Sequence, residues 1–306
     1  MLIGIDVGGT TTNAVLTEGR TVLAESAVAT ISDDVQRSVL EALDGVLGHV
    51  GNAEIERIVL STTVITNLLA ENKAEPVALV LLPGPGADPA DYVLPPAHLV
   101  RGAIDFRGQE ITPVDEEEVH ALADTLRAEG KAKVAVVGKF CQRNPQHERL
   151  VEKWLRQADA DVTVECGHRV SGRLNFPRRA ATTYLTLATR DHYRKFAADM
   201  EQALKERSVD APVFVLKADG GTLPLDYSLQ VPVETIFSGP AASTMGALAL
   251  GPAKSSFIVL DVGGTTTDLA LVLDGQPLLS TSGARVHDLL TQVRAFAVKS
   301  VPVGGD

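Results

Sequence analysis

Two stretches of this 306-residue sequence carry the same residue types at the same spacing. Near the start the chain reads Asp6-Val7-Gly8-Gly9-Thr10-Thr11-Thr12, and near the end it reads Asp261-Val262-Gly263-Gly264-Thr265-Thr266-Thr267. Adjacent glycines allow positive φ and a close approach of the backbone to a ligand, while amides and hydroxyls supply hydrogen-bond donors. Each stretch can therefore cradle phosphate groups.

A carboxylate precedes each pair of glycines, at Asp6 and at Asp261. Hard cations such as Mg²⁺ take oxygen ligands from carboxylates, waters and phosphates. We expect both carboxylates to lie beside a bound phosphate and to hold this cation. The second copy adds Asp268, where the first has Asn13, and an amide can neither accept a proton nor offer full negative charge to a cation.

Hairpin turn chemistry alone is the alternative explanation for Gly-Gly-Thr. A turn, however, requires neither a preceding aspartate nor three threonines, and it has no reason to recur far along the chain. No Gly-Lys-[Ser/Thr] follows the glycines, so this is not a Walker A loop. A cradle without lysine that occurs twice predicts two lobes facing one nucleotide.

The flanking residues predict how these motifs are positioned. An apolar run precedes each copy and an alternating run follows it, which is typical of a β-hairpin. Residues 21–30 predict a third strand, Asp33 or Asp34 caps the helix after it, and residues 55–60 predict another strand. This order is the βββα opening of one lobe.

The middle of the chain predicts further α/β structure. Residues 76–82 and 133–138 have the apolar character of buried strands, and residues 83–96 form a loop rich in Pro and Gly. Ligands gather at the carboxyl ends of parallel strands, so Lys139 is a candidate for contacting substrate, with a solvated lysine as the alternative. A helix from Pro177 to about Arg207 is long enough to join two lobes.

Histidines and cysteines offer little chemistry in this sequence. His147 and His168 lack further ligands at metal spacing, which favours structural roles. Cys141 and Cys166 have no CxxC partner and are expected to be buried thiols.

Composition excludes some classes of partner. The formal net charge is −11 and 45% of the residues are hydrophobic, which argues for a globular protein and against nucleic acid or anionic membrane as a partner. With two cysteines, no signal peptide and no apolar run of membrane-spanning length, we expect a cytoplasmic protein.

At the twin motifs the sequence resembles the acetate/sugar kinase, Hsp70 and actin superfamily. Within it, the hydantoinase/oxoprolinase family is the closer match, and this resemblance spans nearly the whole chain. It is carried by Ser61-Thr62-Thr63-Val64-Ile65-Thr66-Asn67-Leu68-Leu69, Asn144-Pro145-Gln146-His147-Glu148, Asp219-Gly220-Gly221-Thr222 and Ser238-Gly239-Pro240-Ala241-Ala242.

The resemblance implies an α/β, two-lobed actin-like ATPase fold with ribonuclease H-like lobes. We expect residues 1–176 to form the N-terminal lobe and residues 177–306 to form the second lobe. In the superfamily the motif that holds adenosine follows the second phosphate hairpin, whereas Gly220-Gly221 and the helix start at Ser238-Gly239 precede it here. The second lobe is therefore expected to be permuted or incomplete.

The resemblance also implies an ATP-dependent hydrolase with ATP and Mg²⁺ as cofactors, which opens hydantoin or 5-oxoproline through a phosphorylated imidic oxygen. Asp6, Asp261 and Asp268 would be catalytic, the first two also holding the metal. Thr62, Thr63 and Asn67 would face the substrate. ATP would be bound by Gly8, Gly9, Thr10, Thr11, Thr12, Gly263, Gly264, Thr265, Thr266, Gly220, Gly221, Ser238 and Gly239.

Two further functions remain open. A subunit of an ATP-dependent ketone carboxylase would share the same site, with a ketone as substrate. A nucleotide-gated assembly or sensor protein, as in actin-like relatives, is an alternative from a different class. Filament formers tend to expose self-complementary surfaces, whereas this sequence shows only a conspicuous loop at residues 83–96, which favours the enzyme. We expect an oligomer, with a second family subunit as a partner.

Overall fold

A computed structural model describes residues 1–31, 34–50, 54–252, 254–264 and 266–305. The chain forms two compact units. Unit 1 comprises Met1–Lys73, Arg190–Ala284 and Val293–Asp306, and unit 2 comprises Ala74–Thr189 and Arg285–Gln292.

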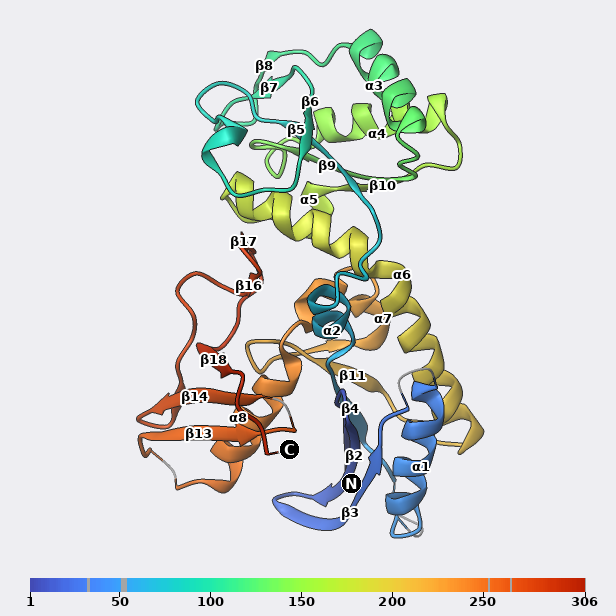
Figure 1. Cartoon of the computed structure of the whole chain (residues 1–306), viewed down its shortest axis with the longest axis vertical. Helices are drawn as coiled ribbons and strands as arrows, with labels where there is room; N and C mark the ends of the chain where they lie inside the picture. Colours follow the sequence, from blue (N-terminus) through green and yellow to red (C-terminus); the bar gives the residue numbers. More distant parts are fainter. Residues whose placement is uncertain (32–33, 51–53, 253, 265, 306) are drawn as a thin grey trace. The chain divides into compact units, whose positions relative to one another are not determined.

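A six-stranded mixed sheet forms the first half of unit 1, with the strand order β12-β11-β4-β1-β2-β3 (Figure 1). β1 and β2 are the first predicted hairpin, and β4 and β11 extend the sheet in parallel with β1. The strands are β1 (Leu2–Val7), β2 (Thr11–Glu18), β3 (Thr21–Ala29), β4 (Arg57–Thr62), β11 (Val213–Leu216) and β12 (Thr222–Pro224).

The second predicted hairpin lies in a separate four-stranded sheet of unit 1. Its antiparallel strands are β13 (Phe257–Val262), β14 (Thr267–Leu273), β15 (Gln276–Pro277) and β18 (Val298–Val301). Side chains of β13 alternate between exposed and half-buried, so one face of this strand carries exposed Ile258, Leu260 and Val262.

The helices of unit 1 pack around these sheets. Asp34 caps α1 by accepting the Arg37 amide, and Asp33 lies outside the described residues. α1 packs on β2 and β3, and Asp44 on its exposed side forms an ion pair with Arg207, which directly follows α6 (Phe176–Glu206). The helices are α1 (Val35–Leu47), α2 (Val64–Ala70), α7 (Leu225–Ser228), η2 (Pro232–Thr235) and α8 (Ser238–Leu250).

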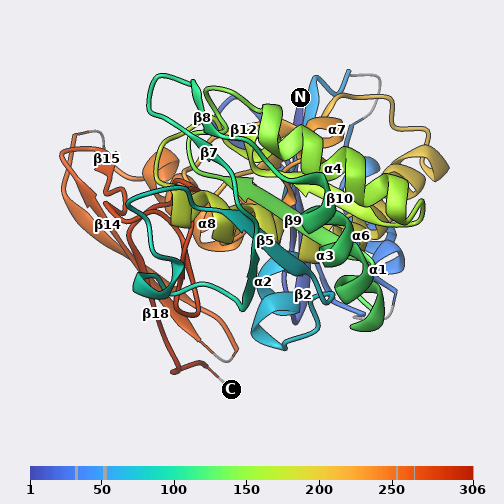
Figure 2. The same cartoon turned by 90° about the horizontal axis from the view of Figure 1, so that it is seen from above.

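Unit 2 is a parallel four-stranded sheet between helices, with the order β10-β9-β5-β6. Because side chains alternate along a strand, Val80 and Val136 pack with residues of α3 and α4, whereas Leu79 and Val137 pack with residues of α6. Figure 2 shows α3 and α4 in front of this sheet. The elements are β5 (Ala78–Leu82), η1 (Pro89–Asp91), β6 (Ala97–Leu99), β7 (Ala103–Ile104), β8 (Glu110–Thr112), α3 (Glu116–Ala128), β9 (Lys133–Gly138), α4 (Gln146–Ala158), β10 (Thr163–Cys166), α5 (Gly167–Val170), β16 (Arg285–Val286) and β17 (Leu289–Leu290).

The predicted long helix is α6 (Phe176–Glu206), and its residues belong to both units, with the division between Thr189 and Arg190. The compact units thus differ from the expected division of the chain at residue 176. The physical reason is strand pairing: β11 follows α6 in the chain but pairs with β4, in the sheet of the first hairpin. Within the described residues, no helix combines the length and the apolar character needed to cross a membrane.

Candidate functional site

The two hairpins have the same register. Asp6 lies opposite Asn13 in the first, and Asp261 lies opposite Asp268 in the second. On its other side, Asp6 pairs with Ser61 of β4. The duplication in sequence is therefore a duplication in structure, with one carboxylate at the same position of each hairpin.

The same hydrogen bond closes both turns. Gly8 N donates to Thr11 O at 3.0 Å, and Gly263 N donates to Thr266 O at 2.9 Å. The expectation of positive φ is wrong for Gly8, Gly9 and Gly263. Glycine is needed at Gly8 for space instead, because a Cβ there would lie 2.8 Å from the Thr11 carbonyl oxygen.

Threonines of the turns differ in what their side chains can do. Gly9, Thr10 and Thr266 are exposed, so their polar groups can reach a ligand. Thr12 is buried, and its hydroxyl lies 2.9 Å from that of Thr30, which also donates to the Gly8 carbonyl. Thr12 therefore supports the turn from within. The predicted contact at Thr265 lies outside the described residues.

The environment of Asp6 favours a bound cation. Burial raises the pKa of its carboxyl above the ordinary value, and the negative charge of Asp261 raises it further. The nearby Ser61 hydroxyl opposes this rise. Asp6 Oδ1 and Ser61 Oγ are nonetheless buried without a hydrogen bond of good geometry among the described residues. A carboxylate oxygen without a hydrogen-bond partner, in the electrostatic field of a second carboxylate, is a suitable ligand for a divalent cation.

Asp261 is held by α8. Ser243 Oγ donates a 2.5 Å hydrogen bond to Asp261 Oδ2. At the start of the same helix, the Ser238 hydroxyl accepts the Thr62 amide at 3.0 Å and donates to the Thr62 carbonyl at 2.8 Å. One helix thus contacts β4, beside Asp6, and β13, which carries Asp261.

The three residues expected to face substrate have different surroundings. Thr62 is buried and its hydroxyl accepts the Val64 amide, so its side chain supports the start of α2. Asn67 is exposed and donates to the Thr63 hydroxyl at 3.2 Å. A Cβ at Gly9 would lie 3.4 Å from Asn67 Nδ2, and a Cβ at Gly239 would lie 3.7 Å from Thr63 Cγ2. Thr63 and Asn67 therefore border the first turn and the start of α8.

The Gly220-Gly221 turn lies in the sheet of the first hairpin, between β11 and β12, and not in a separate second sheet. The Gly220-Gly221 turn therefore precedes the second hairpin in the chain as part of the first hairpin's sheet. Gly220 has a φ of +80°, and a Cβ there would lie 2.7 Å from Phe296 Cζ. Gly220 is therefore required by packing, whereas a Cβ at Gly221 would meet only the Asp219 and Lys217 side chains, at 3.2 and 3.8 Å.

The histidines have the structural roles that the sequence favours. His147 Nε2 lies 2.8 Å from a Glu110 carboxylate oxygen, and His168 Nδ1 lies 2.5 Å from Glu148 Oε2. Glu148 is fully buried and also accepts the amides of Gly138 and His168, so both of its oxygens are satisfied. Although Cys166 Sγ lies close enough to share a metal with Glu148 and His168, these hydrogen bonds already explain the cluster.

Both cysteines are buried and free. Burial raises the pKa of the Cys141 thiol to about 12, and the Glu148 charge adds to this rise. Burial, followed by Glu148 and Glu152, also raises the pKa of Cys166. Neither thiol is therefore prepared to act as a nucleophile.

Sequence reasoning missed Thr30, Ser61 and Ser243. Ser61 precedes the Thr62-Thr63 pair and was the easiest to find, since it ends the strand next to Asp6. Thr30 and Ser243 act through partners 22 and 18 residues away in sequence, and no local pattern indicates such contacts.

Comparison with known proteins gives matches along most of the chain. The family described as "Hydantoinase/oxoprolinase N-terminal region" matches residues 2–159, and "Hydantoinase/oxoprolinase" matches residues 179–306. The alpha subunit of caprolactamase from Pseudomonas jessenii is 25% identical over 90% of this chain and 44% of its own length. The gamma subunit of acetophenone carboxylase from Aromatoleum aromaticum is 25% identical over 99% of this chain and 46% of its own length.

Solved structures of related enzymes also match this chain over nearly its whole length. Nucleotide-free acetone carboxylase superposes with a TM-score of 0.87 at 20% identity, over 99% of this chain and 48% of that one. The ATP-dependent caprolactamase from Pseudomonas jessenii superposes with a TM-score of 0.75 at 25% identity, over 98% of this chain and 48% of that one. The chain spans about half the length of the relatives it matches. It has an actin-like ATPase fold and belongs to the hydantoinase/oxoprolinase family.

Proposed function

We propose that this chain binds MgATP at its twin hairpins and takes part in the ATP-driven opening of a cyclic amide of the hydantoin or 5-oxoproline type. The observation that carries the proposal is the relation between Asp6 and Asp261. The two carboxylates come from opposite ends of the sequence, yet α8 contacts the strand beside Asp6 through Ser238 and binds Asp261 through Ser243. Besides burial, the charge of Asp261 raises the pKa of Asp6. Two carboxylates that repel each other raise the free energy of the folded chain unless a cation lies between them, which supports a shared metal ion.

The residues present fit such a complex. Asp6 has an orphaned oxygen, and Asp261 is oriented by Ser243. The exposed turns at Gly9 and Thr266 offer backbone amides and hydroxyls to phosphate oxygens, and they do so without a bulky side chain. Asp6 and Asp261 would hold Mg²⁺, and the two turns would bind the phosphates.

When bound, ATP would supply a phosphoryl group to the amide oxygen, which makes the carbon more electrophilic toward water, so that water can add there and the ring C–N bond can break. The roles left to the chain are orientation and proton transfer. Asp268 faces Asp261 across the hairpin and is the acidic residue available to orient or deprotonate an attacking water. Thr63 and Asn67, which border the first turn, would contact the substrate.

A cyclic amide as the substrate class is supported by the caprolactamase alpha subunit, since a caprolactamase is named for acting on a lactam. A second candidate is a subunit of an ATP-dependent ketone carboxylase. It is supported by the acetophenone carboxylase gamma subunit, whose match covers 99% of this chain. Both relatives are named as subunits, so we propose that a partner subunit of the same family completes the enzyme.

A double-mutant cycle tests the shared site. Asp6→Ala and Asp261→Ala should each weaken Mg²⁺-dependent ATP binding by at least tenfold, measured by calorimetry of the whole chain, while far-ultraviolet circular dichroism stays unchanged. Because each change breaks the same metal complex, the double variant should be little worse than either single one. Losses that simply add would show two independent carboxylates and overturn the proposal.

A further inference from the structure

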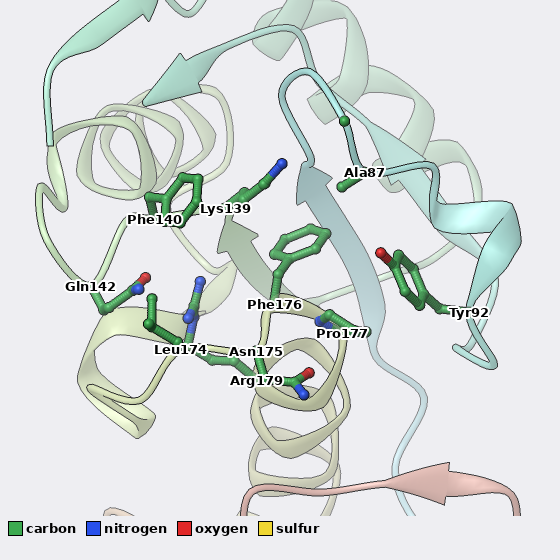
Figure 3. A pocket seen from close by; sticks show the side chains of 11 residues that line it. Ala87, Tyr92, Lys139, Phe140, Gln142, Leu174, Asn175, Phe176, Pro177 and Arg179 are labelled. Carbon is green, nitrogen blue, oxygen red and sulfur yellow. The ribbon is translucent and has the colours of Figure 1, made fainter. Parts of the chain in front are cut away.

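Unit 2 has a pocket of its own, far along the sequence from both hairpins. Its volume is about 390 Å³, within the range of small-molecule sites. Loops after β5 and β9 and the first turn of α6 surround it, so it opens at the carboxyl end of a parallel sheet (Figure 3). This is the position at which open α/β sheets bind ligands.

The charge of the lining is opposite to that of the chain. The chain carries a formal charge of −11, yet Lys139 and Arg179 line the pocket. Among the described residues that line it, no side chain is acidic. The first turn of α6, a helix of 31 residues, adds the positive end of its dipole. The pocket is therefore a local positive region suited to an anion.

Both cations are fixed in place. Lys139 Nζ donates to the Pro85 carbonyl at 2.7 Å and lies 5.4 Å from the centre of the Phe140 ring, which leaves two ammonium protons for a ligand. The Arg179 side chain is 1% exposed, and it donates to the carbonyls of Gly138 and Arg173. The carboxylate whose charge acts on Arg179 is Glu148, which accepts hydrogen bonds from other donors and does not line the pocket.

Two buried polar atoms at the pocket lack partners. Arg179 Nε and Gln142 Oε1 make no hydrogen bond to any part of the chain that the structure describes. Such atoms are costly unless a ligand or water satisfies them. An unpartnered acceptor in a pocket that also holds two cations indicates a ligand that carries a hydrogen-bond donor as well as an anionic group.

Apolar side chains complete the lining. Figure 3 shows Phe140 and Tyr92 on opposite sides, with the Phe176 ring between them. Phe140 and Asn175 have φ values of +62° and +81°, and such strained residues gather at ligand sites.

We infer that this pocket binds a small organic carboxylate with an apolar body and one hydroxyl or N–H donor. Lys139 receives the carboxylate, the positive end of the α6 dipole adds to the field, and Gln142 receives the donor.

Calorimetry of the whole chain without nucleotide tests this inference independently of ATP binding. Mandelate carries a carboxylate, a hydroxyl and a ring, and it should bind. Mandelamide lacks the charge and acetate lacks the ring, so each should bind at least tenfold more weakly, because a charge-assisted hydrogen bond or the apolar contact is lost. Phenylacetate, which lacks the hydroxyl, should bind a few-fold more weakly.

Variants separate this pocket from other anion sites. Lys139→Gln should weaken mandelate about tenfold. Lys153→Gln removes the same charge from an exposed position on α4 outside the pocket and should leave affinity unchanged. Gln142→Leu should abolish the preference for mandelate over phenylacetate and leave phenylacetate binding nearly unchanged. No binding of mandelate at millimolar concentration, equal binding of mandelamide, or full affinity in Lys139→Gln would each overturn the inference.

Discussion

Ser243 Oγ donates a 2.5 Å hydrogen bond to Asp261 Oδ2, and this contact joins a helix to the second hairpin. Five residues earlier in that helix, Ser238 holds both backbone groups of Thr62 in the strand beside β1. α8 therefore connects the two hairpin sheets of unit 1. A rigid connection of this kind can keep two carboxylates at the spacing that a shared cation requires.

The first prediction concerns Ser243→Ala. A hydrogen bond to a charged acceptor is worth about 1.5–3 kcal/mol, so loss of this donor should weaken Mg²⁺-dependent ATP binding several-fold. The melting temperature should change little, because Asp261 is only half-buried. Ser256→Ala is the matched control, since it removes a hydroxyl next to Asp274 at the far end of the same hairpin. If both variants bind ATP equally well, Ser243 does not position Asp261 for a ligand.

The second prediction uses the raised pKa of Asp6. The folded chain holds this proton to a higher pH than the unfolded chain does, so the stability of the ligand-free protein should fall as pH rises through the interval above 3.8. Asp6→Asn removes the charge and should raise stability at pH 7 by roughly 0.5–2 kcal/mol, while it abolishes Mg²⁺-dependent ATP binding.

Urea unfolding at several pH values checks this prediction. The gain in Asp6→Asn should shrink as pH falls through the interval above 3.8 and should be lost below 3.8, where the wild-type carboxyl is protonated in both the folded and the unfolded chain. Asp226→Asn, at an exposed position on α7, should show no such gain. A less stable Asp6→Asn variant at pH 7 would mean that Asp6 is a structural carboxylate.

The third prediction separates two adjacent glycines. Gly8→Ala would place a Cβ 2.8 Å from the Thr11 carbonyl oxygen, so it should destabilise the protein by about 1–3 kcal/mol. Gly9 is exposed, and a Cβ there meets only the Asn67 amide at 3.4 Å. Gly9→Ala should keep stability within about 0.5 kcal/mol and still weaken ATP, because the added methyl intrudes on the cradle. Unchanged ATP affinity in Gly9→Ala would mean that this hairpin is only a chain turn and does not bind ATP.

Local patterns predicted most of the elements. The strands around Asp6 and Asp261, the cap at Asp34 and the long helix after Pro177 are all where periodicity and turn residues put them. These features depend on neighbours within a few residues. The side chains that line a hairpin turn are also local, which is why the twin carboxylates could be identified from the sequence.

Features that depend on distant partners were not predictable. Strand β11 pairs with β4, more than 150 residues earlier in the chain, so no local pattern assigns Gly220 and Gly221 to the first sheet. The same limit applies to Thr62, whose spacing suggests a ligand contact although Ser238 and Val64 occupy its polar groups. Tertiary contacts decide which of several similar polar residues face a ligand.

The last prediction concerns the β11–β12 turn and adenosine. If Gly221 and the start of α8 receive the purine end of the nucleotide, ATP should bind more tightly than inorganic triphosphate, because the adenosine half fills a site of its own. Gly220 cannot test this, since its φ of +80° and its contact with Phe296 make any substitution structural. Gly221→Val adds bulk where only Asp219 and Lys217 lie near, so it should erase the preference for ATP and leave triphosphate binding nearly unchanged. Calorimetry with both ligands decides the question: equal affinities in the unmutated chain would mean that the adenosine contacts come from another segment or a partner chain.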